Sequence, residues 1–200
     1  MFFISLAILL GPLWSGKFQV IDMLNSSSSC AGISNYPVNV SATTALPSGV
    51  IGGMSVFCGG VSNRTESSAC YAYNTTLDLW TLLANMVVPR RDAAGAVVNG
   101  ALWVTGGYKH GHSPSSYLKS TEFIFPNGTT LDGPDLPEAR HRFCIVTLHD
   151  SRVMILGAEH PIRIADKPEI FDPDTNTFSK GPDMLFKRSR LGIHFCLHLN

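Results

Sequence analysis

The feature that most limits the fold is a repeat of about 50 residues that runs along the chain. Its clearest copies are residues 133–142 (GPDLPEARHR) and 181–190 (GPDMLFKRSR), in which both arginines of one copy match both of the other. An apolar segment ending in small residues also recurs, at 54–60, 101–107 and 152–158. Landmarks that share one period are hard to produce by chance, so each copy is expected to fold as the same unit.

Each copy is expected to form one sheet of four short β-strands. Asn-Gly pairs, such as Asn99-Gly100, mark tight hairpins, and no sustained 3.6-residue periodicity follows the first residues. Residues 102–104 are apolar on both faces of a strand, so the sheets must be stacked on one another. Four-stranded sheets at this period predict an all-β fold, a β-propeller rather than a sandwich. In the second copy the expected strands are residues 95–99, 101–107, 120–125 and 129–133.

Several of these landmarks resemble kelch repeats over about residues 38 to 200: the strand that ends in Gly-Gly, the Tyr73 to Trp80 spacing, and a Pro-x-Arg-like segment before each unit. Two copies depart from the pattern, with Ala158 at a glycine position and Leu131 in place of a late aromatic. The aromatics are expected to fill the wedges between sheets. The residues expected to define the repeat are Gly59, Gly60, Gly106, Gly107, Gly157, Tyr73, Trp80, Phe171 and Phe178.

The resemblance implies a kelch-type propeller of about three four-stranded blades and the first strand of a fourth. Propellers usually close with four to eight blades, so this incomplete ring is expected to be the N-terminal part of a longer propeller, monomeric once complete. The expected divisions are a signal peptide (1–16), a lead-in (17–37), blades at 38–86, 87–138 and 139–186, and the start of a fourth blade (187–200).

The N-terminus indicates the compartment. Residues 2–14 form an uncharged apolar run shorter than the roughly 18 residues that span a bilayer. Such a run is typical of a signal peptide, with a buried strand or a short signal anchor as alternatives. A secreted, extracellular glycoprotein without a membrane span is therefore expected. The Asn-x-Ser/Thr acceptors for glycosylation are Asn25, Asn39, Asn63, Asn74 and Asn127.

The five cysteines lack the close spacing of a zinc site, so a disulfide is preferred in an oxidising compartment. Cys58 ends the second strand of the first unit and Cys70 begins the third, so the two can lie opposite each other and bond. The alternative is two buried thiols. Cys144 and Cys196 occupy equivalent first strands and are expected to be too far apart to bond, and Cys30 has no evident partner.

No catalytic constellation is found, and no cofactor or metal is expected. The formal net charge is zero, so nucleic-acid binding is not expected. His110 and His112 lie close together but lack a carboxylate or thiol as third ligand. The arginines at 91, 142 and 190 recur with the repeat, which favours a structural role linking the blades.

The loops after the Gly-ended strands, at 61–68, 108–119 and 159–166, vary in length and should emerge on one face, where propellers commonly bind. We therefore expect a non-catalytic interaction module for a protein or a glycan. One alternative is a fragment of a galactose-oxidase-like copper oxidase, whose ligand tyrosines and histidines cannot be matched here. The other is a ubiquitin-ligase-type kelch adaptor, for whose dimerisation domain residues 1–37 are too short. The possible binding loop contains Tyr108, Lys109, His110, His112 and Tyr117.

Overall fold

The chain is built from β-strands. Within the described part there is no α-helix, and so no helix long and apolar enough to cross a membrane. The expected all-β class is thereby confirmed. The computed structural model describes residues 6–8, 19–21, 34, 36–37, 40–41, 46–111, 116–160, 163–164 and 167–185.

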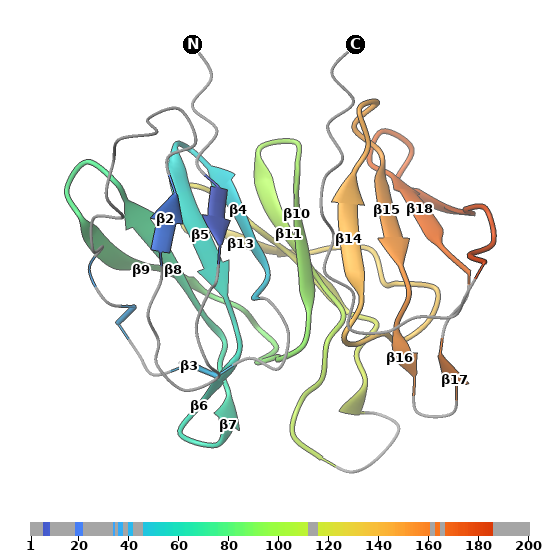
Figure 1. The fold of residues 1–200 in the computed structure, drawn as a ribbon, viewed down its shortest axis with the longest axis horizontal. Helices are drawn as coiled ribbons and strands as arrows, with labels where there is room; N and C mark the ends of the chain where they lie inside the picture. Colours follow the sequence, from blue (N-terminus) through green and yellow to red (C-terminus); the bar gives the residue numbers. More distant parts are fainter. Residues whose placement is uncertain are drawn as a thin grey trace.

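Three four-stranded antiparallel sheets form the body of the molecule, as expected, and stand next to one another without closing into a ring (Figure 1). In each sheet the strands follow chain order from the first to the fourth. Blade 1 consists of β4 (Ser48–Ile51), β5 (Met54–Cys58), β8 (Ala69–Asn74) and β9 (Leu79–Asn85). Blade 2 consists of β10 (Ala94–Val98), β11 (Ala101–Thr105), β12 (Thr121–Ile124) and β13 (Thr130–Asp132). Blade 3 consists of β14 (Cys144–Thr147), β15 (Val153–Leu156), β18 (Glu169–Asp172) and β19 (Thr177–Lys180).

Shorter strands lie outside the three blades and form small antiparallel sheets of their own. One of them contains Leu6–Ile8, in the run expected to be a signal peptide; this pairing does not test whether the run is cleaved. The short strands are β1 (Leu6–Ile8) with β2 (Gln19–Ile21), β3 (Val40–Ser41) with β6 (Val61–Ser62) and β7 (Thr65–Glu66), and β16 (Glu159–His160) with β17 (Arg163–Ile164).

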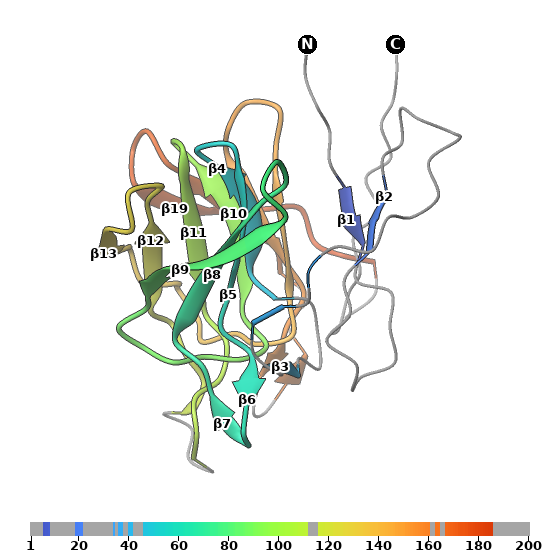
Figure 2. The same ribbon diagram turned by 90° about the vertical axis from the view of Figure 1, so that its left-hand side faces the viewer.

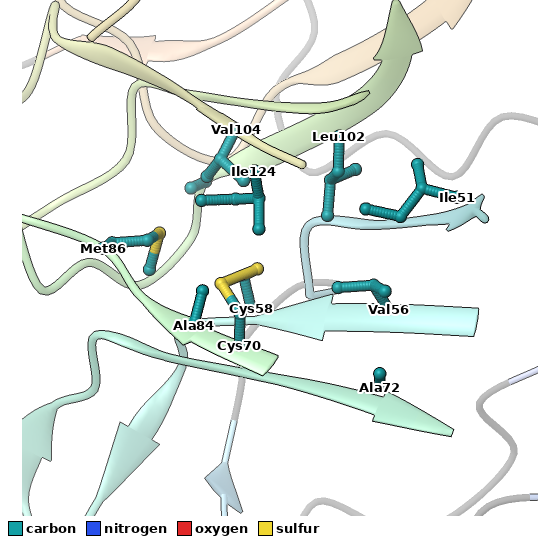
Figure 3. Packing of buried hydrophobic residues seen from close by; sticks show 11 residues of the cluster. Ile51, Val56, Cys58, Cys70, Ala72, Ala84, Met86, Leu102, Val104 and Ile124 are labelled. Carbon is teal, nitrogen blue, oxygen red and sulfur yellow. A yellow bond between two sulfur atoms is a disulfide. The ribbon is translucent and has the colours of Figure 1, made fainter. Parts of the chain in front are cut away.

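Two apolar layers hold the three blades together. Between blades 1 and 2, Val56 and Ala72 face Leu102, Val104 and Ile124 (Figure 3). A second cluster, which includes Trp103, Val153 and Ile155, joins blades 2 and 3. Because both faces of blade 2 are covered, all five residues of β11 are buried. This is the stacking that the doubly apolar strand predicts.

Phe171 and Phe178 fill the wedge between blades 2 and 3, as expected, whereas Tyr73 and Trp80 lie on a face of blade 1 that no described blade covers. Tyr73 lies opposite Trp80 in one hairpin, and Phe171 lies opposite Phe178 in another. The ring of Trp103, from the preceding blade, packs against both phenylalanines, with ring centroids 4.4 and 6.4 Å apart. Aromatic pairs at these distances add to the stabilisation that burial provides.

Blade 2 departs from the aromatic pattern at a different residue from the one expected. Ile124 lies opposite Leu102 just as Tyr73 lies opposite Ser55, so Ile124 takes the place of the first aromatic. Its partner across the hairpin is Thr130, not Leu131. The side chain of Leu131 is 55% exposed, so the expectation that Leu131 replaces the late aromatic was wrong. The hairpin of blade 2 is one residue shorter than the other two, since Ile124 pairs with Thr130 where Tyr73 pairs with Trp80, and this shift in register moves Leu131 out of the wedge.

Candidate functional site at the loop face

The connections between the second and third strands of all three blades extend from the same end of the sheets (Figures 1 and 2). We call this end the loop face. In blade 1 the connection carries the β6–β7 hairpin, and in blade 3 it carries β16 and β17. In blade 2, Tyr108 and Tyr117 pair across the base of the loop. The expectation that these variable loops share one face is therefore met.

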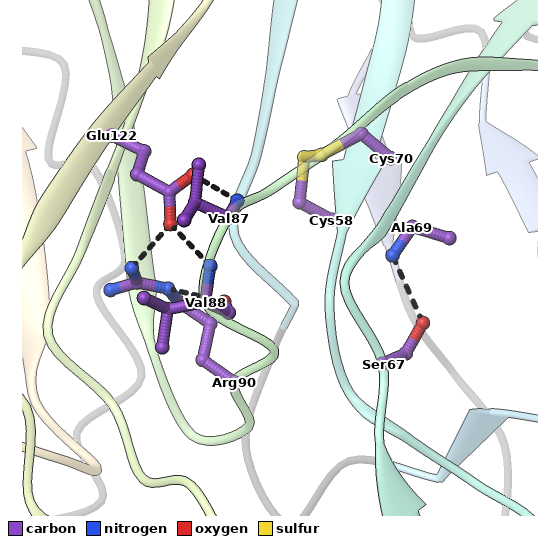
Figure 4. Close-up of a disulfide and its surroundings, with 8 residues drawn as sticks. All are labelled: Cys58, Ser67, Ala69, Cys70, Val87, Val88, Arg90 and Glu122. Atoms are coloured by element: carbon purple, nitrogen blue, oxygen red, sulfur yellow. Dashed lines mark hydrogen bonds and ion pairs between the residues drawn. A yellow bond between two sulfur atoms is a disulfide. The ribbon is translucent and has the colours of Figure 1, made fainter. Parts of the chain in front are cut away.

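A buried arginine lies beneath the loop face at each junction between blades. Arg90 is fully buried and forms a 2.6 Å ion pair with Glu122 (Figure 4). Its guanidinium also donates to the carbonyls of Gly106 and Ser120, at 2.9 and 2.7 Å. The Glu122 carboxylate accepts the backbone N–H of Val87 as well, at 2.6 Å. The segment that enters blade 2 is thus fixed to the second and third strands of that blade.

Arg140 repeats this arrangement at the entrance to blade 3. It donates to the carbonyl of Gly157 at 3.0 Å and lies 3.1 Å from Glu169. Glu169 Oε2 nevertheless has no hydrogen bond of acceptable geometry within the described part of the chain. Burial raises the pKa of Glu169, and the charge of Arg140 opposes that rise. The second junction is therefore a looser copy of the first.

The structure corrects which arginines are equivalent. Gly60 N–H donates to the carbonyl of Arg90 at 3.0 Å, and Gly107 N–H donates to the carbonyl of Arg140 at 2.7 Å. Arg90 and Arg140 are thus the equivalent arginines that link successive blades, in place of the expected set of Arg91, Arg142 and Arg190.

Arg91 and Arg142 also contact the preceding blade, through Glu66 and Asp92, but from positions that are not equivalent. Arg91 occupies the same position in its blade as His141, and Arg142 the same position as Asp92, so Arg91 and Arg142 are not equivalent. Arg190 lies outside the described residues.

The Gly-Gly landmark has a direct structural reason. Gly59 and Gly106 adopt positive φ angles of 74° and 55°. A Cβ on Gly59 would lie 2.5 Å from the carbonyl oxygen of Arg90, and one on Gly106 would lie 2.7 Å from that of Arg140. Only glycine allows this approach of one blade to the next without strain.

Alternating charges lie at the loop face over both junctions. Arg91 is 3.2 Å from Glu66, and Arg142 is 3.3 Å from Asp92 and 2.9 Å from Glu159. We call these five residues the charged belt. They come from the segments that enter blades 2 and 3 and from the β5–β8 and β15–β18 connections. The charge of Arg142 is shared between two carboxylates, which raise its pKa against the effect of burial.

An aromatic cluster lies beside the charged belt. The rings of Tyr108 and Tyr117 meet edge to face at 5.3 Å, and Tyr117 lies 4.8 Å from His141. The guanidinium of Arg91 lies over the Tyr108 ring, 4.7 Å from its centroid. Burial and the charge of Arg142 lower the pKa of His141. The cluster therefore gives the base of the blade 2 loop a fixed shape.

A pocket of about 220 Å³ opens between the β6–β7 hairpin and the blade 2 loop. We call it the hairpin pocket. Two arginines and one glutamate give it a mixed but net positive charge. The lining residues are Val61, Arg64, Glu66, Arg91, Tyr108, His110 and Gly111.

Only some residues of the predicted binding loop line the hairpin pocket. Tyr108 and His110 line it, Tyr117 packs behind Tyr108, and Lys109 is exposed next to them. His112 lies outside the described residues. Sequence reasoning missed Arg64 and Glu66 as site residues. A signal was present, since both lie in the first of the three variable loops, but nothing in the sequence showed which loops would meet.

The structure joins Cys58 and Cys70 in a disulfide, with an S–S distance of 2.05 Å (Figure 4). The two residues are opposite each other in the β5–β8 ladder, and both are fully buried. Cys144 begins β14 and is half-buried. Cys30 and Cys196 lie outside the described residues.

The glycosylation acceptors within the described part lie in turns or at strand ends. Asn63 occupies the turn of the β6–β7 hairpin, Asn74 ends β8, and Asn127 is in the turn before β13. The side-chain oxygens of Asn74 and Asn127 accept backbone N–H groups of their own turns, from Thr76 and Thr129. Asn25 and Asn39 lie outside the described residues.

Across the described residues, no group of three or more histidine, cysteine, aspartate or glutamate side chains is placed to hold a metal ion.

Comparison with known proteins places the fold. No family model matches the sequence. An F-box/kelch-repeat protein of Arabidopsis thaliana is 26% identical over 153 residues, which are 75% of this chain and 39% of the plant protein. The solved structure of YjhT superposes with a TM-score of 0.72 at 14% identity, over 85% of this chain and 60% of that one. This chain thus spans about two fifths of the plant relative's length. With three blades joined through Gly-Gly strands, the chain has the fold of a kelch-type β-propeller, and its described blades do not close into a ring.

Proposed function

We propose that the chain is a non-catalytic, extracellular interaction module that binds a protein or a glycan through the loop face. One observation carries this proposal: three connections of unequal length and composition meet on one face, beside the charged belt and the aromatic cluster. The opposite ends of the same strands are joined by short turns, such as the one at 52–53. Binding sites are commonly built on variable loops that a rigid scaffold positions.

The extracellular part of the proposal is supported by the disulfide and by the acceptor sites. Disulfides persist in oxidising compartments and are rare in the cytosol. Asn127 is exposed, and its side-chain oxygen is held by the turn. Its amide nitrogen is therefore presented for modification. The apolar run at residues 2–14 resembles a signal peptide and so also supports export.

A second candidate function is the substrate-binding part of a ubiquitin-ligase adaptor. It is favoured by the name of the plant relative, an F-box/kelch-repeat protein, with which the chain shares 26% identity. This function would also use the loop face, but inside the cell. The two candidates are thus separated by compartment and by the redox state of Cys58 and Cys70.

The deciding experiment is expression of the whole chain in cultured animal cells. The extracellular proposal predicts a product in the medium that is oxidised at Cys58–Cys70 and loses mass on treatment with N-glycosidase. A product that stays in the cytosol with free thiols and no glycan would contradict it and favour the adaptor.

Use of the loop face is tested with paired variants in a cell-surface binding assay. The side chains of Lys109 and His110 are not needed for folding, since both are exposed. The variant K109A/H110A should therefore lose binding while remaining folded. The control D174A/T175A alters an exposed turn at the opposite end of the strands and should bind normally. Equal binding by both variants would show that the loop face is not used.

A further inference from the structure

The hairpin pocket contains an arginine that is held in an unfavourable backbone conformation. Asn63 and Arg64 form the turn of the β6–β7 hairpin, with φ angles of 50° and 67°. Asparagine tolerates this left-handed region, but a long side chain such as arginine is uncommon there. Arg64 is exposed, and the ion pairs of the described part of the chain do not include it. Its charge is therefore available to a ligand.

The second arginine of the pocket is held in place from three sides. The backbone of Arg91 pairs with that of Tyr108, with N···O distances of 3.0 and 2.8 Å. Its guanidinium lies over the Tyr108 ring and 3.2 Å from Glu66. A guanidinium fixed in this way loses little side-chain entropy when it binds a further group. Arg91 is thus a rigid hydrogen-bond donor on one wall of the pocket. Arg64, on the hairpin, is an exposed donor with a long side chain on the other wall.

The charge and size of the pocket limit what it can accept. Among the residues that line the pocket, two guanidinium groups outweigh the single carboxylate of Glu66, and Asp92, which lies 3.9 Å from Arg91, is paired with Arg142 as well. An anion is therefore favoured. The volume of about 220 Å³ is smaller than the roughly 300–1,000 Å³ of sites for drug-sized ligands. The pocket therefore suits one charged group rather than a whole sugar chain or peptide. Guanidinium groups match the oxygen pairs of carboxylates, phosphates and sulfates.

We propose that the hairpin pocket is an oxyanion subsite, in which Arg64 and Arg91 bind one carboxylate, phosphate or sulfate group of the partner. The proposal rests on the proposed function, because it names the chemistry that the loop face recognises. His110 and the ring of Tyr108 form the remaining walls.

The test is a titration of the ¹⁵N-labelled whole chain, with its disulfide formed, followed by NMR. Sodium acetate, phosphate and sulfate are added separately, with sodium chloride holding the ionic strength constant. We expect saturable shifts of the Arg64 and Arg91 side-chain N–H signals and of the His110 amide, with a dissociation constant on the order of millimolar. Saturation by acetate identifies a carboxylate as the ligand group, and saturation only by phosphate or sulfate identifies a tetrahedral one.

Two matched variants make the test specific. Arg64→Gln should weaken anion binding at least tenfold. Arg152→Gln removes the same charge from an arginine that is 44% exposed and lies far from the pocket in the β14–β15 turn, so it should leave binding unchanged. Equal unfolding midpoints would show that both variants are folded. Shifts that never saturate, or equal losses in the two variants, would overturn the subsite. Secretion and loop-face binding are measured separately, so either proposal can fail without the other.

Discussion

At the scale of single residues, the junctions between blades depend on a charge pair that water cannot reach. Arg90 is fully buried, and Glu122 is 2% exposed. Burial lowers the pKa of Arg90, and Glu122 offsets this effect. A buried pair is weak support for stability as a whole, but the loss of one partner leaves an uncompensated charge. The pair therefore acts mainly to fix the position of the segment that enters blade 2.

Replacing Glu122 by glutamine tests this role. The substitution keeps the shape of the side chain but removes the charge that Arg90 requires, so the free energy of unfolding should fall by about 3–5 kcal/mol. Urea denaturation followed by circular dichroism measures the loss. Asp150→Asn, in the exposed pair with Arg152, is the control and should change the midpoint little. Similar effects of the two substitutions would contradict the buried role of Glu122.

At the scale of elements, a segment from before blade 1 covers the open aromatic face of that blade. The Tyr36 segment, residues 34, 36 and 37, packs Tyr36 on Trp80 and Tyr71, with ring centroids 4.9 and 5.3 Å apart. The indole N–H of Trp80 donates to the carbonyl of Ser34 at 2.9 Å. Tyr36 thus takes the place that Trp103 of blade 2 has on blade 3. The Tyr36 segment therefore covers the aromatic face of blade 1 in the way that a preceding blade would.

Asp78 anchors this segment, and its ionisation should control the contact. Its carboxylate accepts the Ser34 N–H at 2.8 Å and the Tyr73 hydroxyl at 2.6 Å. These bonds lower the pKa of Asp78, the bond from the Ser34 backbone most strongly. A folded-state pKa below the unfolded value adds stability at neutral pH that is lost as the pH falls through the folded value.

Hydrogen exchange of the Trp80 indole proton measures the effect. Exchange should become faster as the pH falls below about 4, the ordinary range of an aspartate, beyond the intrinsic pH dependence of an exposed indole. In Asp78→Asn the contact should be weaker at neutral pH and should lose this acid transition. An unchanged acid transition in Asp78→Asn would show that another group controls the segment.

The disulfide between Cys58 and Cys70 also stabilises blade 1, by joining its second and third strands. It closes a loop with a sequence separation of 12 between Cys58 and Cys70. In the chain-entropy model, closing a loop of this size stabilises the folded state by about 3 kcal/mol. Refolding in a reductant should therefore lower the unfolding free energy by about that amount, as measured in urea. The double variant C58A/C70A is the control, because the reductant should not affect its stability further. A reductant effect that persists in the double variant would exclude this bridge as its source.

At the scale of the whole molecule, the repeat could be predicted from the sequence, and the contacts between distant segments could not. The period and the Gly-Gly strands depend on neighbours within one unit, so they are visible in the sequence. The hairpin pocket joins Arg64 to Tyr108, and the Tyr36 segment meets Trp80, across separations that no local pattern encodes. The arginines at the junctions between blades could be predicted only in part. Their recurrence was visible, but only the backbone contacts between blades distinguished Arg90 from Arg91.

Because each blade contacts only its neighbours, a substitution at one junction should destabilise one blade of the three more than the others. Trp103 is fully buried between blades 2 and 3, where it contacts Phe171. Trp103→Ala should remove about 3–5 kcal/mol, and the loss should fall mainly on blade 3. Native-state hydrogen exchange should then show faster exchange in β15 and β18, while β5 and β8 keep most of their protection. Leu131→Ala, at an exposed site, is the control. Equal loss of protection in all three blades would contradict this expectation. It would mean that the three blades unfold as one cooperative unit, because destabilisation at blade 3 would then reach the disulfide-closed blade 1 through blade 2.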